Sequence, residues 1–151
     1  MNIIEKTKSI IQDFPQIKDV CDNINIDFTA DNVDSYGLNS LGDFLVSKSI
    51  TGNEIRNHAF VLFAKYSSFN DYQRLSNSGL LLNLQRYLER IYNEEFDDNG
   101  ENCEITSIRC SNAQLFELPS ESLVKEVIYQ IQILVNYKIY RWKELKIWLK
   151  N

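Results

Sequence analysis

The chain has 151 residues, of which 44% are hydrophobic and 12% aromatic, the composition of a folded globular protein. Its length fits a single domain with a full core, and its net charge of −5 argues against a free-standing binder of duplex DNA, which needs a basic surface. Five cations and one anion after Tyr137 give that end +4, so the remainder carries −9. The basic end is either a solvated terminus or a docking segment for an acidic partner.

The cysteines predict free thiols. The chain has an odd number of cysteines, Cys21, Cys103 and Cys110, and none of them forms a CxxC pair. We also expect no signal peptide. This pattern is typical of a reducing compartment. No apolar run is long enough to span a membrane, so we expect no membrane partner.

The first third of the chain predicts a helix, a strand and a turn-rich link. Isoleucines at helical spacing predict a helix over residues 2–13, capped by Asn2 and ended by Pro15. Alternating apolar and polar residues predict a half-buried strand over 23–29. Residues 30–42 are expected to form turns, because they combine two glycines with several Asp, Asn and Ser residues.

The middle of the chain supplies a central strand and a long helix. We expect a strand over 43–49, a turn at 51–53, and a strand over 55–65 that is apolar on both faces. Such a strand needs cover on both sides, and the second cover can be a neighbouring subunit. A leucine stripe predicts a helix over 78–93. Residues 94–101 are expected to form a solvated acidic turn, because their spacing does not match an EF-hand calcium loop.

The last third predicts two long strands, 102–117 and 123–140, paired as a hairpin around a turn at 118–121. The second strand is unusually long and is expected to bend or to project beyond the sheet. The expected fold class is α+β in the order α-β-β-β-α-β-β, with a mostly antiparallel sheet and two helices packed on one face. This domain spans residues 1–140, and 141–151 add a short amphipathic C-terminal helix or extension.

The sequence carries no motif for catalysis, metal binding or phosphate binding. His58 is the only histidine, and it lies in a predicted strand without a motif around any serine or cysteine, so we expect a structural or surface histidine. One histidine and three scattered cysteines do not make a standard zinc site. We therefore expect a protein that is not an enzyme, with no catalytic, metal-binding or cofactor-binding residues and no cofactor.

Taken in this order, the elements resemble a known family. The segments that carry the resemblance are NIIEKTKSIIQDFP, NINIDF, VDSYGL, ITGNEIRNHAFVLFAKYSSF, LSNSGLLLNLQRYLERI and the closing Tyr- and Ile-rich hairpin. The chain resembles the tail-terminator proteins of tailed phages, and is more closely similar to the minor capsid proteins of phages and prophages of Gram-positive bacteria. It departs from them in the C-terminal RWKELKIWLKN and in Leu88-Glu89-Arg90, where relatives often have Trp-Leu-Glu.

The resemblance implies a structural protein that forms a ring, usually a hexamer, on the end of the finished tail tube. The ring ends tube polymerisation and offers the surface that joins the tail to the neck or head. Its partners would be copies of itself, the tail tube protein, and sheath and neck or collar proteins, with DNA only as cargo passing through an acidic lumen. The location implied is the tail of a virion, or of a headless phage-tail-like bacteriocin, assembled in the bacterial cytoplasm.

The sequence also suggests where subunits or partners meet. The expected interface residues are Ala59, Val61, Phe63, Tyr137, Trp142, Leu145 and Trp148. The two tryptophans and Leu145 either fold back on their own sheet or anchor in a neighbouring subunit, or in a sheath or neck protein. Three other functions stay open: a head–tail connector or neck completion protein, a generic adaptor with an acidic surface, and a small-molecule enzyme.

Overall fold

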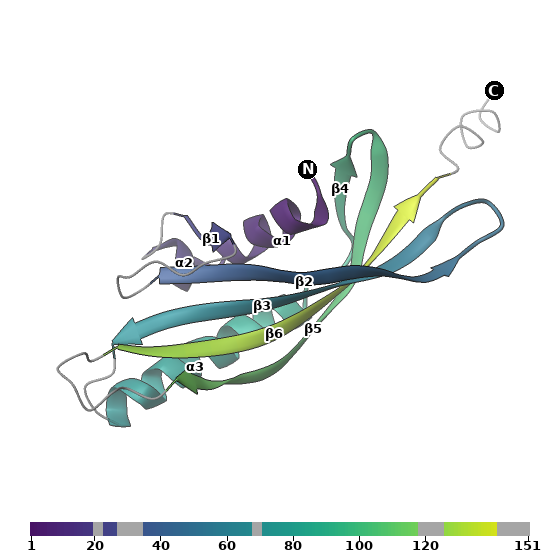
Figure 1. Cartoon of the computed structure of the whole chain (residues 1–151). Coiled ribbons are helices and arrows are strands. Elements are labelled where there is room, and N and C mark those ends of the chain that lie inside the picture. The colour runs from purple at the N-terminus through teal and green to yellow at the C-terminus, as the bar shows by residue number, and fades with distance from the viewer. Residues whose placement is uncertain (20–22, 27–34, 68–70, 118–125, 142–151) are drawn as a thin grey trace.

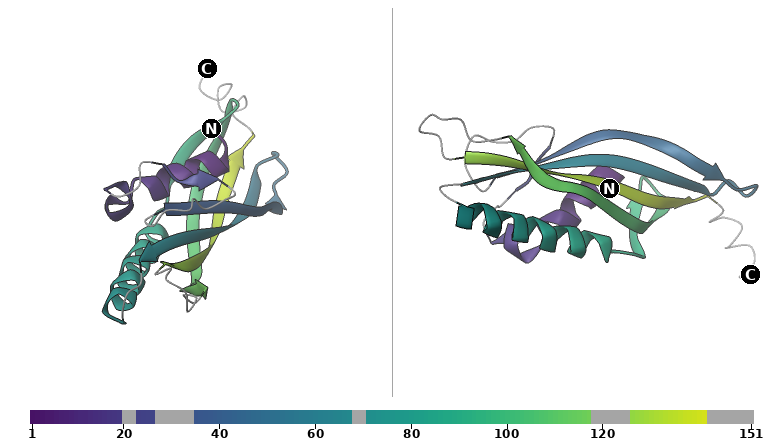
Figure 2. Two further views of the ribbon diagram at one scale, coloured as in Figure 1. Left: turned by 60° about the vertical axis from the view of Figure 1, so that its left-hand side comes forward. Right: turned by 90° about the horizontal axis from the view of Figure 1, so that it is seen from below.

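A strongly curled six-stranded sheet with helices on one face forms the protein (Figures 1 and 2). The computed structural model describes residues 1–19, 23–26, 35–67, 71–117 and 126–141. The helices within them are α1 (Ile3–Gln12), α2 (Pro15–Lys18) and α3 (Asp71–Glu89). The strands are β1 (Asn25–Ile26), β2 (Ser35–Lys48), β3 (Glu54–Ser67), β4 (Glu94–Asp98), β5 (Glu101–Glu117) and β6 (Glu126–Tyr140).

The sheet is mixed, in the order β1-β2-β3-β6-β5-β4. The short β1 runs parallel to β2, and every other neighbouring pair is antiparallel. The long strands twist so far that their order from top to bottom in Figure 1 reverses between the two ends of the sheet. The left part of that view therefore shows the face that the described helices leave open, which we call the uncovered face. The right part shows the helix-side face, beyond the reach of α1 and α3 (Figure 2).

The core lies between the helices and the half of the sheet that they cover. Asn2 caps α1 as expected: its Oδ1 accepts the Glu5 N–H at 2.9 Å, and Glu5 Oε1 accepts the Asn2 N–H at 3.2 Å. The leucines of α3 pack toward β5, and Leu84 and Leu88 are fully buried. Each buried leucine contributes about 1.5–3 kcal/mol. The inward residues of β6 fill the same core, and these are Val127, Tyr129, Ile131, Ile133, Val135 and Tyr137.

The α+β class and the β5–β6 hairpin are confirmed, but the predicted element order is wrong. Pro15 does not only end α1. It occupies the first turn of α2, where its missing N–H costs nothing. The acidic run predicted as a turn is mostly strand β4, because Phe96 packs inward and Asn99-Gly100, with φ of 53° and 91°, makes the turn into β5.

Strand β2 is the larger correction. It begins at Ser35 and includes most of the residues predicted as turns, because pairing with β3 outweighs the turn tendencies of its glycines. A β-bulge accommodates Gly42, whose φ of 135° suits glycine. Helix α3 starts earlier than the leucine stripe suggested. The predicted turn at 118–121 lies outside the described residues, as does all but the first residue of the C-terminal helix predicted over 141–151.

Candidate functional site

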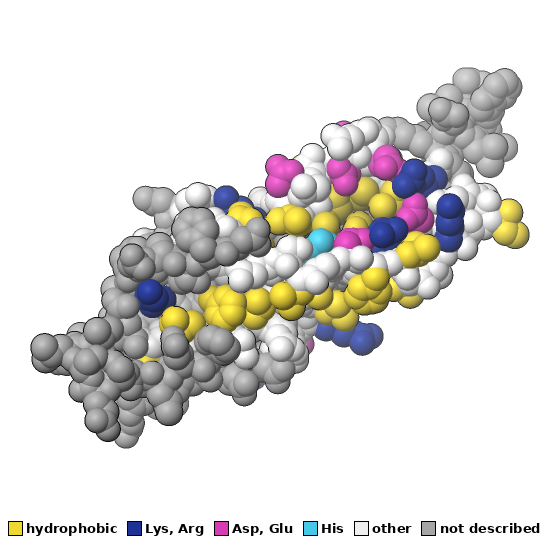
Figure 3. All heavy atoms as spheres, viewed as in Figure 1, with side chains coloured by type: hydrophobic (Ala, Val, Ile, Leu, Met, Phe, Trp, Pro, Cys, Tyr) yellow, Lys and Arg dark blue, Asp and Glu magenta, His cyan; other side chains and the backbone are white. Residues whose placement is uncertain are grey.

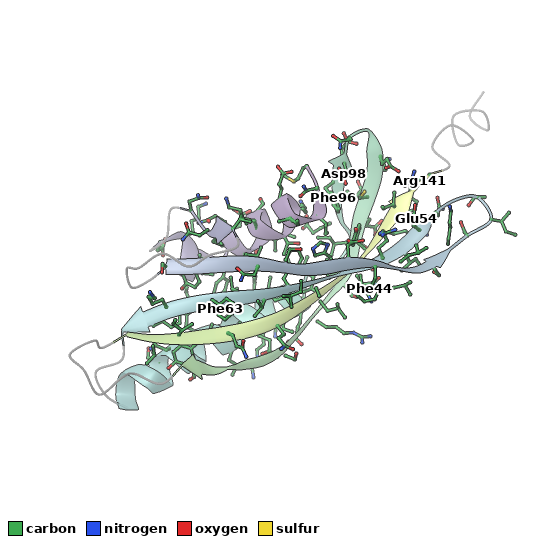
Figure 4. The ribbon with its side chains drawn as sticks, in the orientation of Figure 1. Phe44, Glu54, Phe63, Phe96, Asp98 and Arg141 are labelled. Carbon is green, nitrogen blue, oxygen red and sulfur yellow. The ribbon has the colours of Figure 1, made fainter. Side chains whose placement is uncertain are left out.

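The uncovered face of the sheet carries an apolar strip across β2, β3 and β6. Side chains alternate along β3, so that Phe60 and Leu62 enter the core while their odd-numbered neighbours lie on the uncovered face. We define the apolar strip as Leu41, Phe44, Ala59, Val61, Phe63 and Leu134. Figure 3 shows the corresponding yellow band, and Figure 4 labels Phe44 and Phe63.

The strip combines exposed apolar side chains with an open hollow. Leu41 is 62% exposed and Phe44 is 50% exposed, whereas Val61, deeper in the sheet, is 8% exposed. Leu41, Ala59 and Leu134 line the hollow together with polar residues of β5 and β6. A contiguous apolar surface with a polar rim is typical of a protein-binding face.

Polar residues border the strip on the side of β5 and β6. The Asn136 side-chain amide donates to Asn57 Oδ1 at 2.7 Å, and the Thr106 hydroxyl donates to the Asn136 side chain. Exposed Arg109 and Gln132 lie beside them. These fixed hydrogen bonds give the rim a defined shape before any partner binds.

The predicted interface residues do not all share one face. Ala59, Val61 and Phe63 lie together on the uncovered face, in the middle of the strip. Tyr137 lies on the opposite face, buried, with its hydroxyl bonded to Asp43. Trp142, Leu145 and Trp148 lie outside the described residues. Sequence reasoning missed Leu41, because its segment was expected to form turns. It also missed Phe44 and Leu134, because the pairing of their strands with β3 was not predicted.

A second feature, which we name the polar network, lies on the helix-side face beyond the helices. It links Ser40, Asp43, Glu54, Arg56, His58, Glu101, Tyr137 and Arg141. Figure 3 shows charged side chains and the chain's one histidine gathered there, and Figure 4 labels Glu54 and Arg141. The network ties the β2–β3 hairpin to β5 and to the end of β6.

Glu54 is the centre of one half of the network. Although only 8% exposed, it accepts from Arg56 Nη1 at 2.6 Å and from Arg141 Nη2 at 2.9 Å. Arg141 Nε also reaches Glu101 at 2.8 Å. Two guanidinium groups therefore compensate this buried carboxylate, which would be strongly destabilising without them.

Asp43 is the centre of the other half. It accepts from Arg56 Nε at 2.6 Å, from His58 Nδ1 at 2.8 Å, and from the Tyr137 hydroxyl. Burial opposes ionisation of Asp43, but the hydrogen bonds from Tyr137, Arg56 and His58 outweigh it and lower its pKa below the ordinary 3.8. Burial and the bond to Asp43 raise the pKa of Tyr137, so that its hydroxyl keeps its proton.

The described residues include no group of three or more His, Cys, Asp and Glu side chains that could hold a metal ion. Among those residues, no helix has the length and apolar character needed to cross a membrane. No protein-family model matches the chain, and neither does any curated protein.

Proposed function

We propose that the protein is a tail terminator of a phage or of a phage-tail-like particle, a ring-forming structural protein that ends growth of the tail tube. The observation that carries the proposal is the apolar strip, which lies on a sheet face that none of the described helices covers. When another protein surface covers it, apolar area is removed from water and the free energy of the system falls. In the proposal, that surface belongs to a second copy of the chain.

Ring closure follows from the geometry of such a contact. The strip is on one face of the molecule, and the acidic β4–β5 hairpin and the helices present different surfaces elsewhere. A contact between two different patches is head-to-tail, and it gives a closed ring when its rotation divides a full turn. The expected layers, a sheet with helices on one face, are present, although the order of the elements differs from the expected one. Such a ring blocks the addition of further tube rings without any catalysed reaction, because its two ends differ and only one of them binds the tube.

Two half-exposed apolar residues provide a matched test of this surface. Phe44, in the strip, is 50% exposed, and Leu82, on α3, is 43% exposed. We expect Phe44→Asp to convert assembled protein to monomer in sedimentation velocity, because it places a charge in a face that must lose its water. Leu82→Asp should leave the assembly intact. Equal sedimentation of both variants and the wild type would argue against the strip as the contact.

A head–tail connector would also form a ring, so a second measurement must separate the two functions. In a strain that produces the particles, loss of a terminator gives over-long tail tubes, whereas loss of a connector gives tails of normal length that stay unattached. We expect over-long tubes after deletion of the gene. Complementation with Leu82→Asp should restore normal length, and complementation with Phe44→Asp should not.

A further inference from the structure

Three members of the polar network have a geometry that the proposed function does not use. Ser40 Oγ lies 2.5 Å from His58 Nε2, and His58 Nδ1 lies 2.8 Å from Asp43 Oδ2. Hydroxyl, imidazole and carboxylate thus follow one another in a single hydrogen-bonded chain. We propose that this group makes Ser40 a reactive nucleophile toward uncharged esters and related electrophiles.

The tautomer of a neutral His58 follows from its hydrogen-bond partners. Ionised Asp43 has no proton to give, so it can only accept, and Nδ1 of a neutral His58 must carry the hydrogen. Nε2 is then without a hydrogen and accepts the proton of the Ser40 hydroxyl. This is the tautomer in which an imidazole acts as the general base for a neighbouring hydroxyl.

The bulge in β2 creates this arrangement. In a regular strand, residues 40 and 43 would point to opposite faces. The register shift between Ser40 and Gly42 places both Ser40 and Asp43 on the face that carries His58, with Asp43 directly opposite His58. Bulges are common beside active sites because they redirect a side chain in this way.

The network also holds the three groups in place. Arg56 and Tyr137 fix the Asp43 carboxylate, and the His58 ring stacks on Phe60 with centroids 4.4 Å apart. His58 is only 5% exposed, so its hydrogen bonds compete little with water. Ser40 itself is only partly buried, on the same face of the sheet as Phe60.

The surroundings indicate the class of electrophile. Leu45 points to the same face as Asp43, two residues further along β2, and it is 47% exposed. The register partner of Ser40 is the apolar Phe60, and apolar side chains on the face of the nucleophile favour an uncharged acyl group. The bulge residue Leu41 directly follows Ser40 and has no register partner, and the backbone N–H after a nucleophile is a common donor to a developing oxyanion.

The reaction would proceed in two balanced steps. Ser40 Oγ bonds to the ester carbonyl carbon while its proton moves to His58 Nε2, and the bond to the leaving alcohol breaks as that oxygen takes the proton back. Water then attacks the acyl–Ser40 bond, passing one proton through His58 Nε2 to Ser40 Oγ. The net change is ester and water to acid and alcohol, without an oxidant or a cofactor.

The direct test is covalent labelling of the full-length wild-type protein with a fluorophosphonate probe, read by intact mass and peptide mapping. Serine attack on phosphorus forms the P–O bond and expels fluoride. We expect one label, on Ser40, and none on Ser40→Ala. Ser111→Ala, which removes an exposed serine of β5, should label like the wild type. An unmodified wild type, or a label on a different residue, would overturn the proposal.

Testing the role of His58 requires the rate of labelling as well as its final extent. With folding checked by circular dichroism, His58→Gln should label at least about 100-fold more slowly, which is the lower end of what a general base contributes. Hydrolysis of p-nitrophenyl acetate should fall in parallel in Ser40→Ala and His58→Gln. Labelling of folded His58→Gln at the wild-type rate would show that Ser40 is not activated by this group. Neither result depends on ring formation, so this proposal and the proposed function can fail separately.

Discussion

Replacing Tyr137 by phenylalanine tests the polar network most cleanly, because it removes one hydroxyl and leaves the ring in the core. That hydroxyl donates to Asp43, which keeps two other donors, Arg56 and His58. Hydrogen bonds to charged groups contribute about 1.5–3 kcal/mol. Since Asp43 keeps its other donors, we expect the free energy of unfolding to fall by the lower end of this range, about 1.5 kcal/mol. For a chain of this length, that loss lowers the melting temperature by about 3–6 °C.

The pH dependence of this loss has a definite sign. The folded pKa of Asp43 is lowered, so its contribution to stability is fully present above the unfolded value, near 3.8. The contribution is lost as the pH falls through the lower folded value. The difference in unfolding free energy between the wild type and Tyr137→Phe should therefore shrink as urea denaturation is repeated from pH 7 down to about pH 2.

Tyr140→Phe is the matched control. The Tyr140 hydroxyl donates to Glu104 at 3.1 Å at the end of β6, where both groups are only partly buried. We expect it to cost about 0.5 kcal/mol or less, as for other surface pairs. A loss of stability in Tyr137→Phe no larger than in this control, or one that did not change with pH, would contradict the assigned role of the Tyr137 hydroxyl.

Packing, turn geometry and thiol chemistry each give a further prediction. Leu84→Ala should cost about 2–5 kcal/mol in urea denaturation, because Leu84 is fully buried, whereas Leu82→Ala should change little; equal costs would contradict the packing of α3. Gly100→Ala should cost about 1 kcal/mol by the same assay, since Gly100 has a φ of 91° and alanine gains no contact there. Burial and Glu89 raise the pKa of Cys110 to about 12, so iodoacetamide should alkylate it slowly at pH 8 until the protein unfolds; fast labelling of folded protein would contradict this.

Elements with strong periodicity could be predicted from the sequence. The isoleucines of α1, the doubly apolar β3 and the alternation in β6 each predicted the right kind of element in the right place. The predicted strand over 43–49 matches the second half of β2, but residues 35–42 of β2 and strand β4 were predicted as turns. Their residues are polar or rich in glycine, and pairing with a neighbouring strand decides their conformation.

The polar network lay beyond sequence reasoning for the same reason. His58 was expected to be structural because no serine motif surrounds it in sequence. Ser40 and Asp43 reach it only through the β2–β3 register and the bulge between them. By contrast, the doubly apolar pattern of β3 did predict that Ala59, Val61 and Phe63 would need a second cover. It did not predict which residues of β2 and β6 would complete the strip.

Imaging the purified wild-type protein by negative-stain electron microscopy tests the central claim, that the apolar strip of one copy is covered by the next copy in a closed ring. We expect rings with a central hole, usually sixfold, that disappear in Phe44→Asp and persist in Leu82→Asp. Featureless monomers of the wild type at concentrations where other ring proteins assemble would contradict the claim.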